Sequence, residues 1–98
     1  MKQEKRRKAK AMVTSRITIK NTSGLYVKPA GELCRTAVRF TSSVTFLIGA
    51  YEANAKSLLS VLGAQVRGGD EILLSCEGPD EEEALLAVKE AIESGLGE

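Results

Sequence analysis

Hydrophobic and polar residues alternate with a period of two in three segments of the chain, and this pattern predicts β-strands. The first segment starts at Val13 and ends near Lys20, and the second covers residues 44–48. The third covers residues 72–76. A further short strand is predicted at residues 51–54, after a turn that starts at Gly49.

Apolar residues recur at helical spacing in three other segments. The first helix has Pro29 in its first turn, and its apolar stripe is Ala30, Leu33, Cys34, Ala37 and Val38. A short helix follows Ser57, which stands in the position of an N-cap. The last helix starts after Pro79, with Asp80 and Glu83 spaced as a capping box. Its apolar stripe is Ala84, Leu85, Val88, Ala91 and Ile92.

The predicted order is strand, helix, strand, strand, short helix, strand, helix. Strands that are neighbours in the sequence tend to pair, and the helices must bury their stripes against one face of the sheet. We therefore expect an α+β fold with the architecture of an open-faced sandwich.

Composition fits one small globular domain. The chain has 98 residues, of which 43% are hydrophobic and 28% are charged. With two Phe, two Tyr and no Trp, the core must consist mainly of Leu, Ile, Val and Ala. No apolar run approaches the roughly 18 residues of a membrane span, and no signal peptide is visible, so a cytoplasmic protein is expected.

The chain contains no histidine, which excludes Ser-His-Asp triads, Cys-His pairs and histidine-dependent zinc sites. Cys34 and Cys76 lie far apart and form no Cys-x-x-Cys motif. We expect both to be small buried apolar residues; a disulfide or a reactive thiol is the alternative. No metal and no cofactor are expected.

The net charge of +1 is unevenly distributed. Residues 1–12 hold six bases and one acid, whereas residues 13–98 hold eight bases and twelve acids. We expect a disordered, solvated extension at 1–12 and a folded domain at 13–98. Binding of the extension to nucleic acid or to an anionic membrane is one alternative. The other is that Met12 is the true start.

The segment from Gly24 to Gly31 combines a glycine turn, Lys28 and the mouth of a helix. Free backbone N–H groups and the helix dipole attract anions at such a position. An ordinary helix start, with no ligand, explains the same residues.

This segment resembles the phosphorylation motif of HPr, the histidine-containing phosphocarrier of the bacterial sugar phosphotransferase system. Gly24, Leu25, Pro29 and Ala30 match the motif, whereas Tyr26 stands at the position of the phosphorylated histidine and Lys28 at that of an arginine. Residues 54–62 resemble the family's regulatory serine motif, with Ser57 at the phosphorylated position. The resemblance covers residues 13–98.

The resemblance implies a four-stranded antiparallel sheet covered on one face by three helices. It also implies that Tyr26 and Lys28 form a degenerate phosphoryl-acceptor site, because a phenol with a pKa near 10 is a weak nucleophile at neutral pH. Ser57 would be the substrate of HPr kinase/phosphorylase, and the phosphorylated form would bind a LacI-type catabolite regulator. As a plain N-cap, Ser57 would be structural only.

A partner-docking surface is implied as well. It consists of Leu58, Leu59 and Leu62, flanked by Lys28, Arg35 and Lys56. The alternative is that the three leucines belong to the core.

These features favour a regulatory HPr-like protein that is not an enzyme and does not carry phosphate, similar to the catabolite-repression HPr-like proteins of bacilli. The alternative is a divergent phosphotransferase component that docks Enzyme I or sugar permease domains. Nucleic-acid binding through the basic extension is a third hypothesis.

Overall fold

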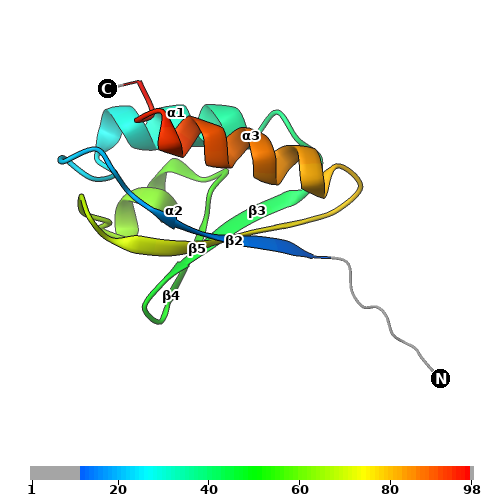
Figure 1. Ribbon diagram of the computed structural model, residues 1–98, viewed down its shortest axis with the longest axis horizontal. Helices are drawn as coiled ribbons and strands as arrows, with labels where there is room; N and C mark the ends of the chain where they lie inside the picture. The colour runs from blue at the N-terminus through cyan, green and yellow to red at the C-terminus, as the bar shows by residue number, and fades with distance from the viewer. Residues whose placement is uncertain (1–11, 98) are drawn as a thin grey trace.

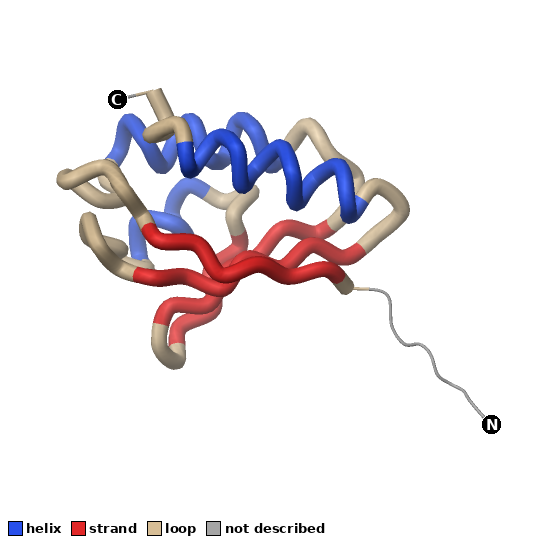
Figure 2. Tube along the Cα trace, in the orientation of Figure 1, coloured by secondary structure: helices blue, strands red, loops and turns tan. Residues whose placement is uncertain are grey.

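The computed structural model describes residues 12–97. Its elements, in chain order, are β2 (Val13–Thr18), α1 (Val27–Ala37), β3 (Ser43–Ile48), β4 (Tyr51–Asn54), α2 (Leu58–Gly63), β5 (Glu71–Glu77) and α3 (Glu81–Glu93). The helices lie on one side of the sheet, and no described element covers the other side (Figure 1, Figure 2). The expected α+β open-faced sandwich is confirmed.

The four strands are antiparallel and have the spatial order β2-β5-β3-β4. The last strand of the chain is therefore central and separates the first two strands from each other. One row of partners across the sheet faces the helices, and it consists of Ser15, Leu74, Phe46 and Ala53. Leu74, Phe46 and Ala53 are at most 1% exposed, so this row is the part of the sheet that packs into the core.

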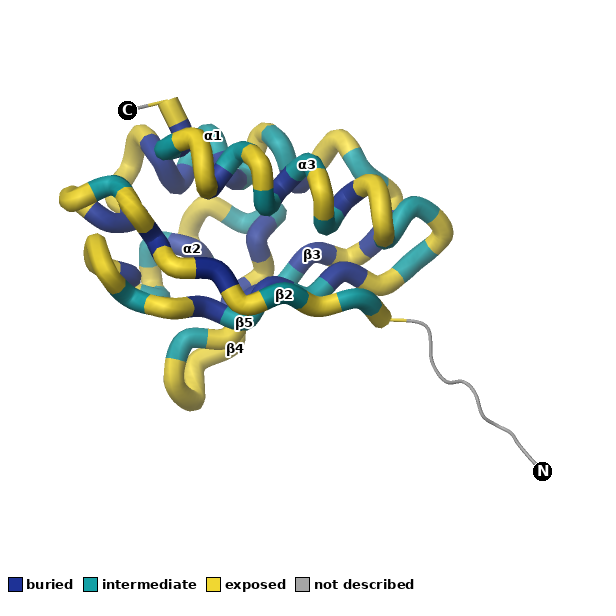
Figure 3. Tube along the Cα trace, viewed as in Figure 1, coloured by how far each residue is buried: buried dark blue, intermediate teal, exposed yellow. Residues whose placement is uncertain are grey.

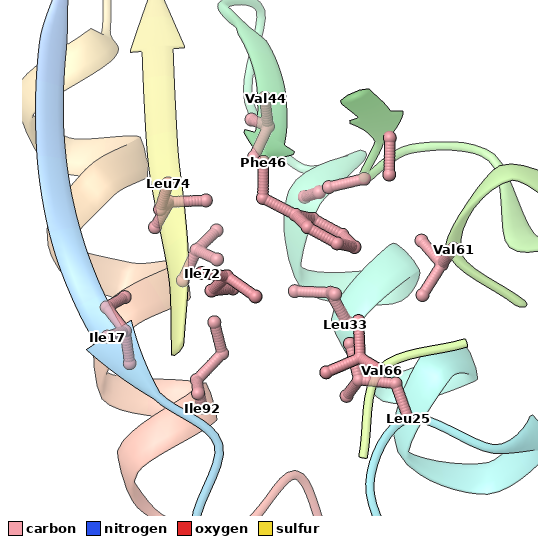
Figure 4. Packing of buried hydrophobic residues seen from close by; sticks show 14 of the residues in the cluster. Ile17, Leu25, Leu33, Val44, Phe46, Val61, Val66, Ile72, Leu74 and Ile92 are labelled. Carbon is pink, nitrogen blue, oxygen red and sulfur yellow. The ribbon is translucent and has the colours of Figure 1, made fainter. Parts of the chain in front are cut away.

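The core fills the space between the sheet and the helices (Figure 3, Figure 4). Its largest fully buried side chains are Phe46, Ile19, Leu33, Ile72, Leu74, Ile92, Val44, Val61 and Val88. Each of the three helices contributes at least one of them. As the composition predicts, aliphatic side chains dominate, and Phe46 is the one aromatic ring in the buried cluster of the described residues.

Two predicted boundaries are wrong. The first strand ends at Thr18 rather than near Lys20, because Ile19 leaves the strand pairing: its N–H donates to the Asp70 carbonyl at 2.8 Å, and its own carbonyl accepts from Gly69. Val38 does not belong to the apolar stripe of α1. The helix ends at Ala37, and Val38, its C-cap, is 56% exposed.

The predicted capping box of α3 is also wrong. Asp80 is the N-cap but makes no side-chain bond to its own helix. Its carboxylate instead accepts the Ser42 hydroxyl and the backbone N–H groups of Thr41 and Ser42. These hydrogen bonds, above all that of the Ser42 hydroxyl, lower the pKa of Asp80 to about 2. Thr41 and Ser42 are distant from Asp80 in the sequence. Their hydrogen bonds to Asp80 join the loop after α1 to the start of α3.

Both cysteines are free thiols. Cys76 is fully buried, as expected, whereas Cys34 is only partly buried. Burial, and secondarily the charges of Glu81 and Asp80, raises the pKa of Cys76 to about 11, so this thiol stays protonated at neutral pH.

The predicted basic extension at residues 1–12 lies, except for Met12, outside the described residues, and the three interpretations of it remain predictions. No helix in residues 12–97 is long and apolar enough to cross a membrane.

Candidate functional site

The entrance to α1 is anchored by the residues that match the family motif. Gly24, Leu25, Pro29 and Ala30 are all buried. Gly24 has a φ of +72°, and a Cβ at this position would collide with the Val66 carbonyl. The N–H of Leu25 donates to the same carbonyl at 3.0 Å. The motif's matching residues therefore hold the loop against the body of the domain.

The residues that depart from the motif lie on the surface. Tyr26 is the N-cap of α1 and 44% exposed, and Lys28 is exposed in the first turn. The Tyr26 carbonyl accepts the N–H of Ala30 at 2.8 Å, but its side chain makes no capping hydrogen bond. The structure thus places both residues of the predicted degenerate acceptor site where a partner protein could reach them.

Arg35 does not present an unpaired charge. Its guanidinium donates to the Glu32 carboxylate at 2.5 Å, one turn earlier on the same face of α1. Both side chains are solvent-exposed, so the pair contributes little to stability, but it neutralises part of the flank that was predicted to be basic.

Ser57 is the N-cap of α2, as predicted. It has extended backbone angles, φ −115° and ψ 116°, and its hydroxyl oxygen accepts the N–H of Ser60 at 3.3 Å. Its carbonyl accepts the N–H of Val61 at 3.0 Å. The hydroxyl that the family resemblance marks for phosphorylation is therefore also the atom that closes the first turn of the helix.

Residues of β4 hold α2 in place. The Ser60 hydroxyl accepts the N–H of Asn54 at 2.9 Å, and the Tyr51 hydroxyl donates to the Ser60 carbonyl at 3.2 Å. A Cβ on Gly63 would lie 2.9 Å from the Tyr51 hydroxyl oxygen, so the absence of a side chain at Gly63 leaves room for the Tyr51 side chain. The sequence motif did not indicate these contacts, because they depend on the β3–β4 hairpin.

Gln65 follows the C-cap of α2 and has a φ of +53°, a left-handed conformation that glycine adopts more readily than glutamine. Its N–H donates to the Leu62 carbonyl at 3.2 Å and so closes the end of α2.

Lys56 is tethered rather than free. Its ammonium group donates to the Phe40 carbonyl at 2.7 Å, and its N–H donates to the Asn54 side chain at 2.9 Å. The lysine thus connects the loop before α2 to the loop after α1, and its role as a docking charge stays a prediction.

The three leucines of the predicted docking surface have different environments. Leu59 is 82% exposed and Leu58 is 39% exposed, so neither belongs to the core. Leu62 is partly buried and packs against the core, and its part in a docking surface stays a prediction. Leu58 and Leu59, the exposed leucine pair, lie on a helix that contacts α1, so the two sequence motifs occupy neighbouring helices.

A family model described as "PTS HPr component phosphorylation site" matches residues 13–94. The phosphocarrier protein HPr of Treponema pallidum is 31% identical over 89% of this chain and 99% of its own length. Longer curated proteins match as well. The chain is 40% identical to a multiphosphoryl transfer protein of Vibrio cholerae but spans only 22% of that protein's length.

Two solved structures are similar throughout the fold. The structure named HPr-C-His, from Thermoanaerobacter tengcongensis, has a TM-score of 0.84 and 38% identity, and the match covers 88% of this chain and 97% of that one. Crh, the catabolite repression protein of Bacillus subtilis, has a TM-score of 0.69 and 28% identity, with 97% of both chains covered. With the same fold and a family match over 13–94, the chain belongs to the HPr family of the bacterial phosphotransferase system.

Proposed function

We propose that this chain is a regulatory HPr-like protein that binds other proteins and does not carry phosphate on a histidine. The observation that carries the proposal is the absence of histidine from all 98 residues, together with Tyr26 at the exposed mouth of α1. We place the protein in the cytoplasm and assign it to carbon catabolite control. The likeness to Crh supports this choice.

The chemistry of the proposed acceptor position argues against phosphate relay. Imidazole is nucleophilic at neutral pH and is also a good leaving group, so it can both accept and release a phosphoryl group. A phenol such as that of Tyr26 is a poor nucleophile at neutral pH, because the pKa of phenols in general is near 10, and an aryl phosphate is a poor phosphoryl donor. Lys28 provides a positive charge without the planar fork by which arginine holds phosphate.

Incubation with Enzyme I and phosphoenolpyruvate tests this proposal. No phosphoryl group should be transferred to the chain, whereas a histidine-containing HPr in the same mixture should be labelled. Stable label on this chain that passes on to a sugar permease domain would disprove the proposal and support the alternative, a divergent phosphotransferase component.

That alternative has one favourable observation of its own. The exposed leucine pair offers an apolar contact surface on α2, and such surfaces commonly bind partners. Enzyme I or a permease domain could dock there without receiving phosphate. A binding measurement in which Leu59→Ala weakens the complex with Enzyme I, with no transfer of label, would establish docking alone.

We further propose that Ser57 is the regulatory site and that HPr kinase/phosphorylase and a LacI-type catabolite regulator are the partners. The Ser57 hydroxyl would attack the γ-phosphorus of ATP and lose its proton to the kinase, with ADP as the leaving group. The resulting dianion would lie next to the free N–H groups at the start of α2.

Intact mass spectrometry after incubation with the kinase and ATP tests the second proposal. The chain should gain one phosphoryl group, and Ser57→Ala should remove the gain. Ser94→Ala is the matched control, because Ser94 is an exposed serine at the end of α3 and has no part in the start of α2. No gain, or a gain that survives Ser57→Ala, would contradict the proposal.

A further inference from the structure

The described helices leave one face of the sheet uncovered (Figure 2), and its charged side chains are mostly acidic. Along each strand, charged residues that alternate with buried ones point away from the helices. They are Arg16 on β2, Glu71 and Glu77 on β5, and Glu52 on β4. Arg16 is paired with Glu71 at 3.9 Å, whereas Glu77 and Glu52 have no ion-pair partner among residues 12–97. The open face therefore offers two unpaired carboxylates.

Neutral polar side chains separate these two carboxylates. One row across the four strands, here called the polar row, consists of Thr14, Ser75, Thr45 and Asn54. At its β4 end lies a cleft of about 530 Å³, to which Thr45, Asn54 and Glu52 contribute. Lys56 also lines this cleft, but its ammonium group already donates to the Phe40 carbonyl at 2.7 Å. The polar row can thus form hydrogen bonds with a polar or basic peptide.

The chain enters the sheet beside one of the unpaired carboxylates. Val13 is paired with Cys76, so the antiparallel register places Met12 next to Glu77. The start of α3, which has three glutamates in its first turn, lies at the same end of the molecule (Figure 1). Residues 1–11, here called the basic segment, therefore join the described residues at the edge of the open face and at an acidic end of the molecule.

Charge and length both suit the basic segment to this face. The segment contains six bases and one acid, a net charge of +5, whereas residues 13–98 hold eight bases and twelve acids, a net charge of −4. Fully extended, the segment reaches about 36 Å, at about 3.3 Å per residue. Four strands about 4.8 Å apart span only about 14 Å. Even after a turn of about four residues, the segment can cross from Glu77 to Glu52.

We propose that the basic segment binds the open face of its own sheet and crosses the polar row from Glu77 towards Glu52. Its ammonium and guanidinium groups pair with these two carboxylates and with oxygen atoms of the polar row. The alkyl stems of its lysines and arginines cover Leu73 and Leu47, which are paired in the next row. A second copy of the chain would instead set the acids of one face against those of the other.

Binding of the basic segment to the face is reversible. Exposed ion pairs each contribute little, so the segment exchanges between a bound and a released form. While the segment is bound, its charge is not available to a polyanion such as a nucleic acid. Such a partner must displace the segment from the acidic face, so the face weakens every interaction that is made through the segment.

Two-dimensional NMR of the full chain, with one signal per backbone amide, tests the proposal. The reference is the full-length neutralised variant Lys5→Gln/Arg6→Gln/Arg7→Gln. At low salt the Ser75 and Thr45 signals should differ between the natural chain and this variant, and signals from the last turn of α3 should not. Raising the salt from about 10 mM to about 1 M shortens the screening length from about 30 Å to about 3 Å, so the natural chain's signals should move to the variant's positions. Signals that do not depend on salt would overturn the proposal.

Charge reversal tests whether the acids of the face make the contact. Glu52→Lys should lower the ratio of bound to released segment about threefold, since it replaces one attractive pair by a repulsive one. The ratio is read from the difference in the Ser75 signal between each chain and its own neutralised variant. Glu93→Lys is the matched control, because it changes the net charge equally at an exposed residue at the end of α3. Equal losses with both substitutions would overturn the proposal.

The competition with polyanions is tested with a short oligonucleotide. Glu52→Lys and Glu93→Lys have the same net charge, but the first should bind the oligonucleotide about threefold more tightly, because its basic segment is released more often. Equal affinity, or binding by neither chain, would overturn the proposal.

Protein concentration distinguishes the basic segment from a second copy as the occupant. Binding within one chain does not depend on concentration, so the Ser75 and Thr45 signals should stay constant on dilution. Signals that move with concentration would assign the face to a second copy and would overturn the proposal.

Discussion

The starts of α1 and α2 carry the two family motifs, but they are held in place by different forces. The α1 entrance depends on buried apolar residues, Leu25, Pro29 and Ala30, and its N-cap Tyr26 makes no side-chain cap. The start of α2 depends on hydrogen bonds that involve Ser57 and Ser60. At α1, anchoring and surface chemistry belong to different residues, so the chemistry can change while the fold persists. At α2, the hydroxyl that we propose for phosphorylation is also the one that accepts the N–H of Ser60.

The largest test of this difference compares two leucines. Leu25→Ala should reduce the free energy of unfolding by about 3 kcal/mol, because it empties a buried site at the α1 entrance. Leu59→Ala should change it by less than about 0.5 kcal/mol, because that side chain is mostly in solvent. Urea denaturation measures both. Equal losses would contradict the distinction between a packed and a hydrogen-bonded start.

Two glycines of the α1 motif should respond in opposite directions. Gly24→Ala should destabilise the domain by about 2 kcal/mol, since the new Cβ meets the Val66 carbonyl at a positive φ. Gly31→Ala should stabilise it by up to about 1 kcal/mol, because Gly31 is inside a helix with open space around the new methyl group. A stabilising Gly24→Ala, seen in thermal unfolding, would show that the entrance is not tightly packed.

Loss of the α2 cap should have a smaller effect. Ser57→Ala should cost about 1 kcal/mol, because the N–H of Ser60 loses its acceptor. Ser57→Asp should retain nearly full stability, since a carboxylate oxygen can accept the same N–H. If the two variants are equally stable in urea titrations, the hydrogen bond between the Ser57 hydroxyl and the N–H of Ser60 does not stabilise the helix. Phosphorylation would then be the one role left for this hydroxyl.

The smallest effect concerns the start of α3 and appears only in acid. The pKa of Asp80 is about 2, below its ordinary value near 4, so its hydrogen bonds to Ser42 and Thr41 stabilise the fold above pH 4. This contribution is lost as the pH falls through 2, where the carboxylate is protonated. The stability difference between the natural chain and Asp80→Asn should therefore shrink between pH 4 and pH 2. A difference that stays constant over this range would contradict the assignment.

Local patterns predicted those features that neighbouring residues control. The strand at residues 44–48 and the helix with Pro29 in its first turn depend on periodicity and backbone restriction, and both are confirmed. Ser57 was identified as an N-cap for the same reason. Asp80 shows the limit of such prediction, because its hydrogen-bonding partner is not Glu83, three residues away, but Ser42, in the loop between α1 and β3.

The sequence could predict which residues belong to the candidate site, but it could not predict which of them are exposed to solvent. The motif identified Leu58, Leu59 and Leu62 as a group, yet only the packing of α2 against the sheet and α1 decides that Leu62 turns inward and Leu59 outward. The pairing of Arg35 with Glu32 could have been found from their helical spacing of three. The contact between Lys56 and the Phe40 carbonyl could not, because it joins two loops.

The sequence by itself determined the order of the elements, the aliphatic core, the absence of histidine and the two motifs, because each depends on residue identity or on short-range periodicity. Tertiary structure decided that β5 lies between β2 and β3 and which side chains of each motif face solvent. Such features depend on strand register and on contacts between distant segments, and those contacts exist only once the chain has folded.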